Sequence, residues 1–295
     1  MFNAISARGW YLYGALALAA LGGCEKQVVA PSKQVERTQT NQVTEPAASA
    51  KPSRGAPTEA ELSQAEQGAA LVRGLNIVTR TFETLPDHSP SGLHCSSCHL
   101  EGGTKALAGP WLGIAAKYPV YRARSGKVDT LEERINGCFE RSMNGRALDP
   151  NGPDMAAIVS YIHYISRDVP AGETPGRGFA KLTRPAALDR ERGQALYGQK
   201  CSACHAPNGA GLSPGDVYAF PPLAGARAFN IGAGMARLNT AAAFIQANMP
   251  LGQGGTLSAQ DAYDLADYVI HLERPEFARK AEDWPRGDKP EDARY

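Results

Sequence analysis

Cys95-Ser96-Ser97-Cys98-His99 is the motif on which the fold prediction depends. Its C-x-x-C-H spacing is typical of a c-type haem attachment site, in which both cysteine thiols bond the porphyrin and the histidine becomes an axial ligand of the iron. A second copy, Cys201-Ser202-Ala203-Cys204-His205, follows in the second half of the chain. A zinc site would require the two cysteine pairs to converge on one metal, whereas each pair here has its own histidine. The sequence therefore predicts two covalently bound haem c groups.

Composition narrows the class of protein only a little further. The chain has 295 residues, enough for one large or two ordinary domains, and a formal net charge of +1. That charge gives no indication of nucleic acid or another polyanion as partner. The 31 glycines and 21 prolines indicate long loops. Four of the six cysteines belong to the haem motifs, which leaves Cys24 and Cys138 to be explained.

The N-terminus reads as an export signal. Arg8 precedes an apolar run over residues 10–21 that is too short for a membrane span, and Leu21-Gly22-Gly23-Cys24 closes it. This ending resembles the lipobox of bacterial lipoproteins, which would make Cys24 the lipidated residue; the alternative is a secretory signal cut nearby that leaves Cys24 as a spare thiol. We predict a bacterial periplasmic protein held to a membrane only by a lipid anchor. Glu25 favours the outer membrane.

The fold predicted for the rest is all-α, with two tandem cytochrome c-type domains that each hold one covalent haem, after a lipoprotein signal and a flexible tether. The Gln-, Thr-, Ser- and Pro-rich tether shows no apolar periodicity. We expect the tail to pack loosely. The predicted parts are a signal peptide 1–23, a tether 24–57, an N-terminal domain 58–170 with haem 1, a linker 171–185, a C-terminal domain 186–275 with haem 2, and a charged tail 276–295.

Capping signals place the helices. Thr58 and Glu61 form a capping box for a helix that continues towards Arg80, and Thr130 and Glu133 form another. The second of these helices carries Cys138. Further helices are predicted from Pro153, over 189–200, near 240–247 and from Ser258.

Each haem iron needs a second axial ligand or an open site. In the second half Met249, followed by Pro250, is the favoured ligand, with Met235 as its rival; either methionine could instead simply fill the core. In the first half Cys138 follows His99 by about as many residues as Met249 follows His205. A thiolate ligand would lower the reduction potential and a thioether would raise it. The alternative for Cys138 is a buried, inert thiol.

The segment 134–145, Arg-Ile-Asn-Gly-Cys-Phe-Glu-Arg-Ser-Met-Asn-Gly, resembles the thiosulfate dehydrogenase (tetrathionate synthase) family of dihaem cytochromes c. Segments 220–223, 229–235 and 248–250 are similar too, and the resemblance covers roughly 58–275. It implies that the first haem, ligated by His99 and Cys138, is the active site. The second haem, ligated by His205 and Met249, would be the electron exit. Some members have a lysine before the methionine as an alternative ligand, whereas this chain has Asn248, so we expect no such ligand switch.

The resemblance implies a reaction that joins two thiosulfate dianions into tetrathionate with release of two electrons, or the reverse. Two dianions about 4 Å apart at an effective dielectric constant near 20 repel each other by roughly 16 kcal/mol, so fixed cations must offset the repulsion. Basic residues outnumber acidic ones between 117 and 146, although a charge-rich helix is often only a solvated face. Arg124 and Arg134 match family positions that line the substrate pocket, and Ser142 is a candidate hydrogen-bonding neighbour.

The resemblance also suggests covalent catalysis, in which Cys138 leaves the iron, carries a thiosulfonate group and is released by a second thiosulfate. Electrons would pass from the second haem to a cytochrome c or a high-potential iron–sulfur protein. Two alternatives remain: a non-catalytic dihaem electron carrier, and the cysteine-ligated dihaem subunit of a sulfur-oxidising multienzyme complex. A carrier needs neither Cys138 nor the arginines, and the Arg-Ser-Met-Asn-Gly context favours the dehydrogenase over the complex subunit.

Overall fold

The structure is a computed structural model that describes residues 55–215 and 217–295. The predicted signal peptide, the lipidation site Cys24 and most of the tether lie outside these residues. The described residues are mostly helical, as predicted, with one small antiparallel sheet. Among them, no helix combines the length and apolar character that crossing a membrane requires.

Three helices begin the described part: α1 (Glu59–Ser63), α2 (Gly68–Thr79) and α3 (Thr81–Thr84). The capping box of Thr58 and Glu61 is confirmed. The prediction of one continuous helix is wrong, because Gln67 is in the left-handed region with φ 60° and the chain turns there. Gly68 allows this turn, since a Cβ at Gly68 would lie 2.6 Å from the Ser63 carbonyl oxygen.

The first haem motif opens a stretch of short elements: η1 (Cys95–Ser97), α4 (Leu100–Gly103) and η2 (Ala115–Lys117). Strands β1 (Val120–Arg122) and β2 (Lys127–Asp129) then form an antiparallel hairpin, which the all-α prediction lacked. Each strand has only 3 residues, too few to show an alternating pattern in the sequence.

Helix α5 (Leu131–Arg141) follows the hairpin and starts at the predicted capping box. Helix α6 (Pro153–Ile165) packs along α2, where Gly74 permits close approach: a Cβ there would lie 2.3 Å from the Ala157 carbonyl oxygen. Buried side chains of α2, α5 and α6 form one core, against which Cys95 packs. The first haem motif therefore lies on the core of its own half.

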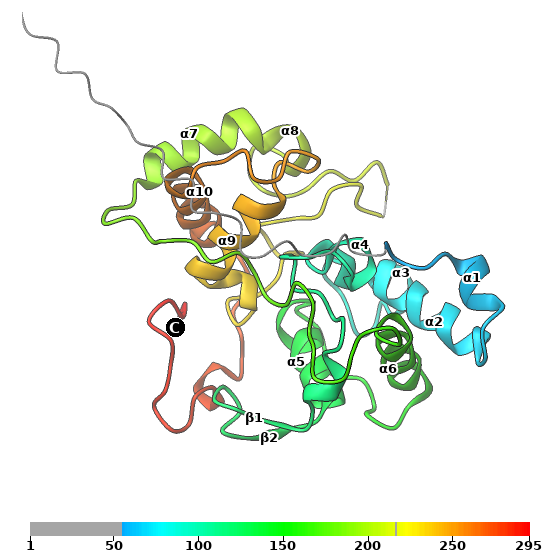
Figure 1. Ribbon diagram of the computed structural model, residues 1–295. Coiled ribbons are helices and arrows are strands. Elements are labelled where there is room, and N and C mark those ends of the chain that lie inside the picture. Colours follow the sequence, from blue (N-terminus) through cyan, green and yellow to red (C-terminus); the bar gives the residue numbers. More distant parts are fainter. Residues whose placement is uncertain (1–54, 216) are drawn as a thin grey trace, which may run out of the picture. The chain divides into compact units, whose positions relative to one another are not determined.

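The second half contains α7 (Arg190–Lys200), α8 (Ser202–His205), η3 (Gly234–Ala236), α9 (Leu238–Asn248) and α10 (Ala259–His271). Helix α10 packs against both α7 and α9, so these three helices gather in Figure 1. Gly193 marks the crossing of α7 and α10, because a Cβ there would lie 2.1 Å from the Asp264 carbonyl oxygen. Asp189 and Ser258 cap α7 and α10 at the predicted starts.

The C-terminal tail contains only η4 (Lys280–Glu282), yet it is firmly docked. The prediction that it packs loosely is wrong: the side chains of Asp283 and Asp292 are 3% and 2% exposed, and Trp284 is buried. The tail runs beside the β1–β2 hairpin (Figure 1), where the Trp284 amide donates to the Arg124 carbonyl at 2.8 Å. Buried ion pairs and aromatic rings hold it, and neither produces a helical period in sequence.

Candidate active site

The first haem motif is fixed by hydrogen bonds on both sides of its histidine. The Cys95 amide donates to Thr81 Oγ1 at 3.0 Å, and the His99 amide donates to the Cys95 carbonyl at 2.9 Å. His99 Nδ1 lies 2.6 Å from the Gly109 carbonyl oxygen. Because a carbonyl only accepts, Nδ1 carries the proton and Nε2 keeps its lone pair. Burial lowers the pKa of His99 to about 4, so the imidazole is neutral, as an axial metal ligand must be.

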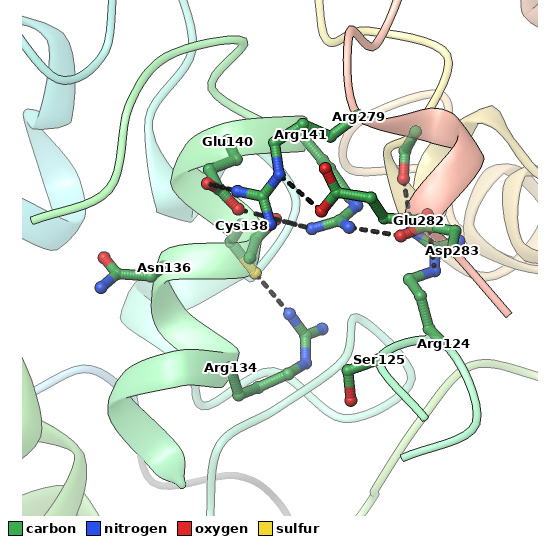
Figure 2. A network of polar contacts seen from close by, with 12 residues as sticks. Arg124, Ser125, Arg134, Asn136, Cys138, Glu140, Arg141, Arg279, Glu282 and Asp283 are labelled. Carbon is green, nitrogen blue, oxygen red and sulfur yellow. Dashed lines mark hydrogen bonds and ion pairs between the residues drawn. The ribbon is translucent and has the colours of Figure 1, made fainter. Parts of the chain in front are cut away.

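One face of α5 carries three of the predicted site residues. Arg134, Cys138 and Ser142 follow one another at intervals of four residues, which aligns them along the helix. Arg134 Nη1 donates to Cys138 Sγ at 2.7 Å, as Figure 2 shows. Negative charge on Cys138 raises the pKa of Arg134 and outweighs the effect of burial. Ser142 is half-buried at the C-terminal end of α5, where its amide donates to the Cys138 carbonyl at 2.7 Å.

Cys138 lies close enough to the Cys95 and Cys98 thiols to interact with them electrostatically. Burial raises the pKa of Cys95 to about 11 and that of Cys98 to about 12, and in both cases the nearby charge of Cys138 raises it further. Arg134 is also close enough to His99 to contribute to lowering the pKa of that imidazole. Two thiols, a neutral imidazole and a further cysteine thus converge, and this donor set fits a covalently attached haem with histidine and thiolate as axial ligands.

Arg124 lies in a different group of side chains from Arg134. Its Nη1 donates to the Gly232 carbonyl at 2.5 Å, its Nε lies 3.6 Å from Asp283 Oδ2, and its guanidinium stacks 4.6 Å from the centre of the Trp284 ring. In Figure 2, Arg134 points towards Cys138, whereas Arg124 points towards Asp283. The structure therefore brings Arg134, Cys138 and Ser142 together and gives Arg124 the C-terminal tail as neighbour.

Two further charged residues belong to this region and were missed by sequence reasoning. Arg141, three residues after Cys138 on α5, donates through Nη2 to Asp283 Oδ1 at 2.6 Å. Its position one turn from Cys138 was a usable signal. Nothing in the sequence indicated Asp283. It lies in a segment without apolar periodicity, more than 100 residues after α5 in the sequence.

The second haem motif repeats the histidine geometry of the first. His205 Nδ1 lies 2.9 Å from the Pro221 carbonyl oxygen, which again leaves Nε2 for a metal. Cys201 packs in one cluster with Ile245 of α9, and Met249 follows one turn later at the end of that helix, half-buried. Asn248 is buried and donates through Nδ2 to the Phe244 carbonyl at 3.2 Å.

The rival methionine occupies another place in the fold. Met235 packs against the core of the first half, together with Cys95 and Trp111. Cys201 of the second motif packs in a separate cluster. This placement favours Met249 over Met235 as the partner of His205.

Comparisons with known proteins agree with this division into halves. Residues 84–171 match the family described as SoxA/TsdA, cytochrome c domain, and residues 189–269 match the family described as cytochrome C oxidase, cbb3-type, subunit III. The chain thus contains two cytochrome c domains.

Several known proteins match most of the chain. A thiosulfate dehydrogenase of Psychrobacter arcticus is 48% identical over 249 residues, which is 84% of this chain and 76% of that protein. One of Allochromatium vinosum is 42% identical over 238 residues, 79% of this chain and 86% of that protein. Among solved structures, the thiosulfate dehydrogenase TsdBA of Marichromatium purpuratum in its as-isolated form superposes with a TM-score of 0.71 at 37% identity. That match covers 80% of this chain but only 51% of the larger TsdBA chain.

Proposed function

The chain belongs to the thiosulfate dehydrogenase family, and from this premise we propose that it oxidises thiosulfate, joining two molecules into tetrathionate and releasing two electrons. The observation that carries the proposal is the Arg134–Cys138 pair. A cysteine sulfur with a guanidinium nitrogen 2.7 Å away, beside a haem attachment motif, unites a nucleophile, a cation for the substrate and an electron acceptor. A plain electron carrier requires no such pair.

The chain would hold two haem c groups. Cys95 and Cys98 would attach the first, and His99 and Cys138 would bind its iron. Cys201 and Cys204 would attach the second, and His205 and Met249 would bind its iron. The haems supply one-electron acceptance, so that two of them together take the two electrons of one turnover.

The side chains of α5 supply the sulfur chemistry. The Cys138 thiolate bonds the sulfane sulfur of one thiosulfate; an S–S bond forms, two electrons leave, and the cysteine carries a thiosulfonate group. The sulfane sulfur of a second thiosulfate attacks the adduct at the sulfur that is bonded to Cys138 Sγ. This expels the Cys138 thiolate and yields tetrathionate without further redox change. Arg134 stabilises the thiolate before the first step and after the second.

Arg134 also reduces the repulsion between anions. A thiolate and a thiosulfate dianion about 4 Å apart repel by roughly 8 kcal/mol at an effective dielectric constant near 20. The half-buried Arg134 guanidinium beside Cys138 offsets part of that repulsion, and Ser142, one turn beyond Cys138, adds a hydroxyl to the same face. Arg124, which pairs with Asp283, also takes part in substrate binding.

The setting of the reaction follows from the export signal and the family. The protein acts in the bacterial periplasm, held to a membrane, in our proposal the outer one, by a lipid on Cys24. Electrons leave through the second haem to a cytochrome c or a high-potential iron–sulfur protein. The same residues support tetrathionate reduction when electrons flow the other way.

Ferricyanide reduction by the purified holoprotein with thiosulfate alone tests the function. We expect two haems per chain, tetrathionate as product, and loss of turnover in Cys138→Gly with the haem content unchanged. Mass spectrometry of substrate-treated wild-type protein should show a thiosulfonate adduct on Cys138. Normal turnover of Cys138→Gly would refute the mechanism. A requirement for an added carrier protein would point instead to a subunit of a sulfur-oxidising complex.

A further inference from the structure

The C-terminal strap, which we define as residues 277–295, is attached to the active-site region by two buried carboxylates. Asp283 and Asp292 are 3% and 2% exposed, and each pairs with arginine. Asp292 binds Arg237, whose Nε lies 2.8 Å and whose Nη2 lies 2.5 Å from Oδ1. Burying a charged carboxylate costs free energy unless its partner is held in place. Two such buried pairs would not be required in a segment without a structural or functional role.

Asp283 differs from Asp292 in what it touches. It lies between two arginines of the first half: Oδ1 accepts from Arg141 Nη2 at 2.6 Å, and Oδ2 lies 3.6 Å from Arg124 Nε (Figure 2). The Tyr295 hydroxyl donates to the same carboxylate. One carboxylate of the C-terminal strap thus fixes two guanidinium groups, one from the turn between β1 and β2 and one from the end of α5.

Aromatic rings of the strap complete the hold on these arginines. The Arg124 guanidinium lies 4.6 Å from the centre of the Trp284 ring, and that of Arg141 lies 4.4 Å from the centre of the Phe277 ring. Both arginine side chains are largely buried, with exposures of 19% and 15%. Stacking limits their rotation, while the carboxylate sets their direction.

Asp283 offsets the electrostatic repulsion between Arg124 and Arg141. Burial lowers the pKa of Arg124, Asp283 raises it again, and Arg141 lowers it by repulsion. Two buried guanidinium groups would separate without an anion between them. A thiosulfate dianion would then have to bring them together itself, at a cost in binding free energy.

The position of the strap connects this group to the chemistry. Arg141 lies one turn after Cys138 on α5, as Arg134 lies one turn before it. Gly232 of the second half accepts from Arg124 and lies against Arg141, since a Cβ there would be 3.2 Å from Arg141 Cγ. Cys138 is therefore bracketed along its helix by two arginines, the second of which is held by the strap.

We propose that Asp283 is a positioning residue of the thiosulfate site, which holds Arg124 and Arg141 in the arrangement that receives the substrate dianion. The proposal rests on the proposed function. Asp283 itself does not touch the substrate; it acts through the two arginines. Through Asp283 alone, the C-terminal strap thereby orders two arginines of the thiosulfate site.

The test compares Asp283→Asn with Asp292→Asn in the full-length holoprotein. Both variants lose one buried carboxylate of the same strap, but only Asp283 contacts Arg124 and Arg141. We expect Asp283→Asn to raise the KM for thiosulfate about tenfold, the effect of losing one charge-assisted contact, with kcat within about twofold of wild type. Asp292→Asn should leave both constants within about twofold, a change of less than one ordinary contact.

Three results would overturn the proposal. An unchanged KM in Asp283→Asn removes the positioning role, and a lowered KM shows that the carboxylate competes with the substrate. An equal rise in Asp292→Asn shows that strap docking alone matters. If Asp283→Asn does not fold, Tyr295→Phe replaces it, since it removes one hydrogen bond to the same carboxylate; we expect a rise in KM of about threefold, and no rise overturns the proposal.

A binding measurement separates this inference from the proposed function. Sulfate, a tetrahedral dianion without a sulfane sulfur, is titrated calorimetrically into the oxidised holoprotein. We expect weaker sulfate binding to Asp283→Asn than to wild type and Asp292→Asn. Wild-type protein without thiosulfate turnover would defeat the proposed function, whereas an active wild type with equal sulfate affinity in all three proteins would defeat only the role of Asp283.

Discussion

Replacing Arg134 by glutamine tests the anion site most sharply, because the change removes one charge and keeps most of the side chain. Arg134 is half-buried and donates to Cys138 Sγ at 2.7 Å. A hydrogen bond to a charged group contributes about 1.5–3 kcal/mol, so its loss should lower kcat/KM for thiosulfate roughly 10- to 150-fold. The loss should exceed that of an ordinary surface charge, because the Arg134 guanidinium contacts Cys138 Sγ directly.

Steady-state ferricyanide reduction at fixed ionic strength measures this effect. Arg146→Gln is the matched control, since Arg146 is exposed, follows α5, and donates through Nε to the Asp87 carbonyl at 2.8 Å rather than to Cys138. We expect the control to stay within about twofold of wild type, as surface substitutions usually do. Equal losses in both variants, or full activity of Arg134→Gln, would refute the reasoning.

Three further predictions concern stability and the second haem. Gly193→Ala should lower the free energy of unfolding by about 1–3 kcal/mol, measured by thermal denaturation, because its Cβ would meet the Asp264 carbonyl; Gly198→Ala on the same helix, with open space around it, should not destabilise. Burial raises the pKa of Asp261, but hydrogen bonds from Ser258 and Arg192 outweigh it and lower the pKa below 3.8, so its contribution to stability is present above that pH and lost as pH falls further. Asp261→Asn should therefore flatten acid denaturation; an unchanged acid transition contradicts this. Met249→Leu should lower the reduction potential of the second haem in a redox titration, and an unchanged potential argues against thioether ligation.

Features that depend only on residues close together in the sequence, such as the starts of helices, were predictable. Capping boxes located the starts of α1 and α5, because each threonine and its glutamate partner lie three residues apart. Arg134 was placed near the substrate by the resemblance alone; its contact with Cys138 agrees with helical spacing, since residues four apart share a face. The break at Gln67 was missed because an apolar pattern continues through it.

Contacts between distant segments were not predictable in the same way. Arg124 and Arg134 looked alike in sequence, both cations near Cys138, yet only the fold assigns Asp283 to Arg124. The tail looked loose because charged residues without periodicity usually stay solvated. Its docking depends on where arginines of other elements already lie, and that information is not in the tail.

The account rests on sulfur of Cys138 reaching the haem iron held by His99. Electron paramagnetic resonance of the oxidised holoprotein tests this directly, with Cys138→Gly as the variant and Ser142→Gly as control one turn further along α5. We predict a thiolate-ligated low-spin signal in wild type and in the control, and its absence from Cys138→Gly. Identical spectra of all three proteins would contradict the account.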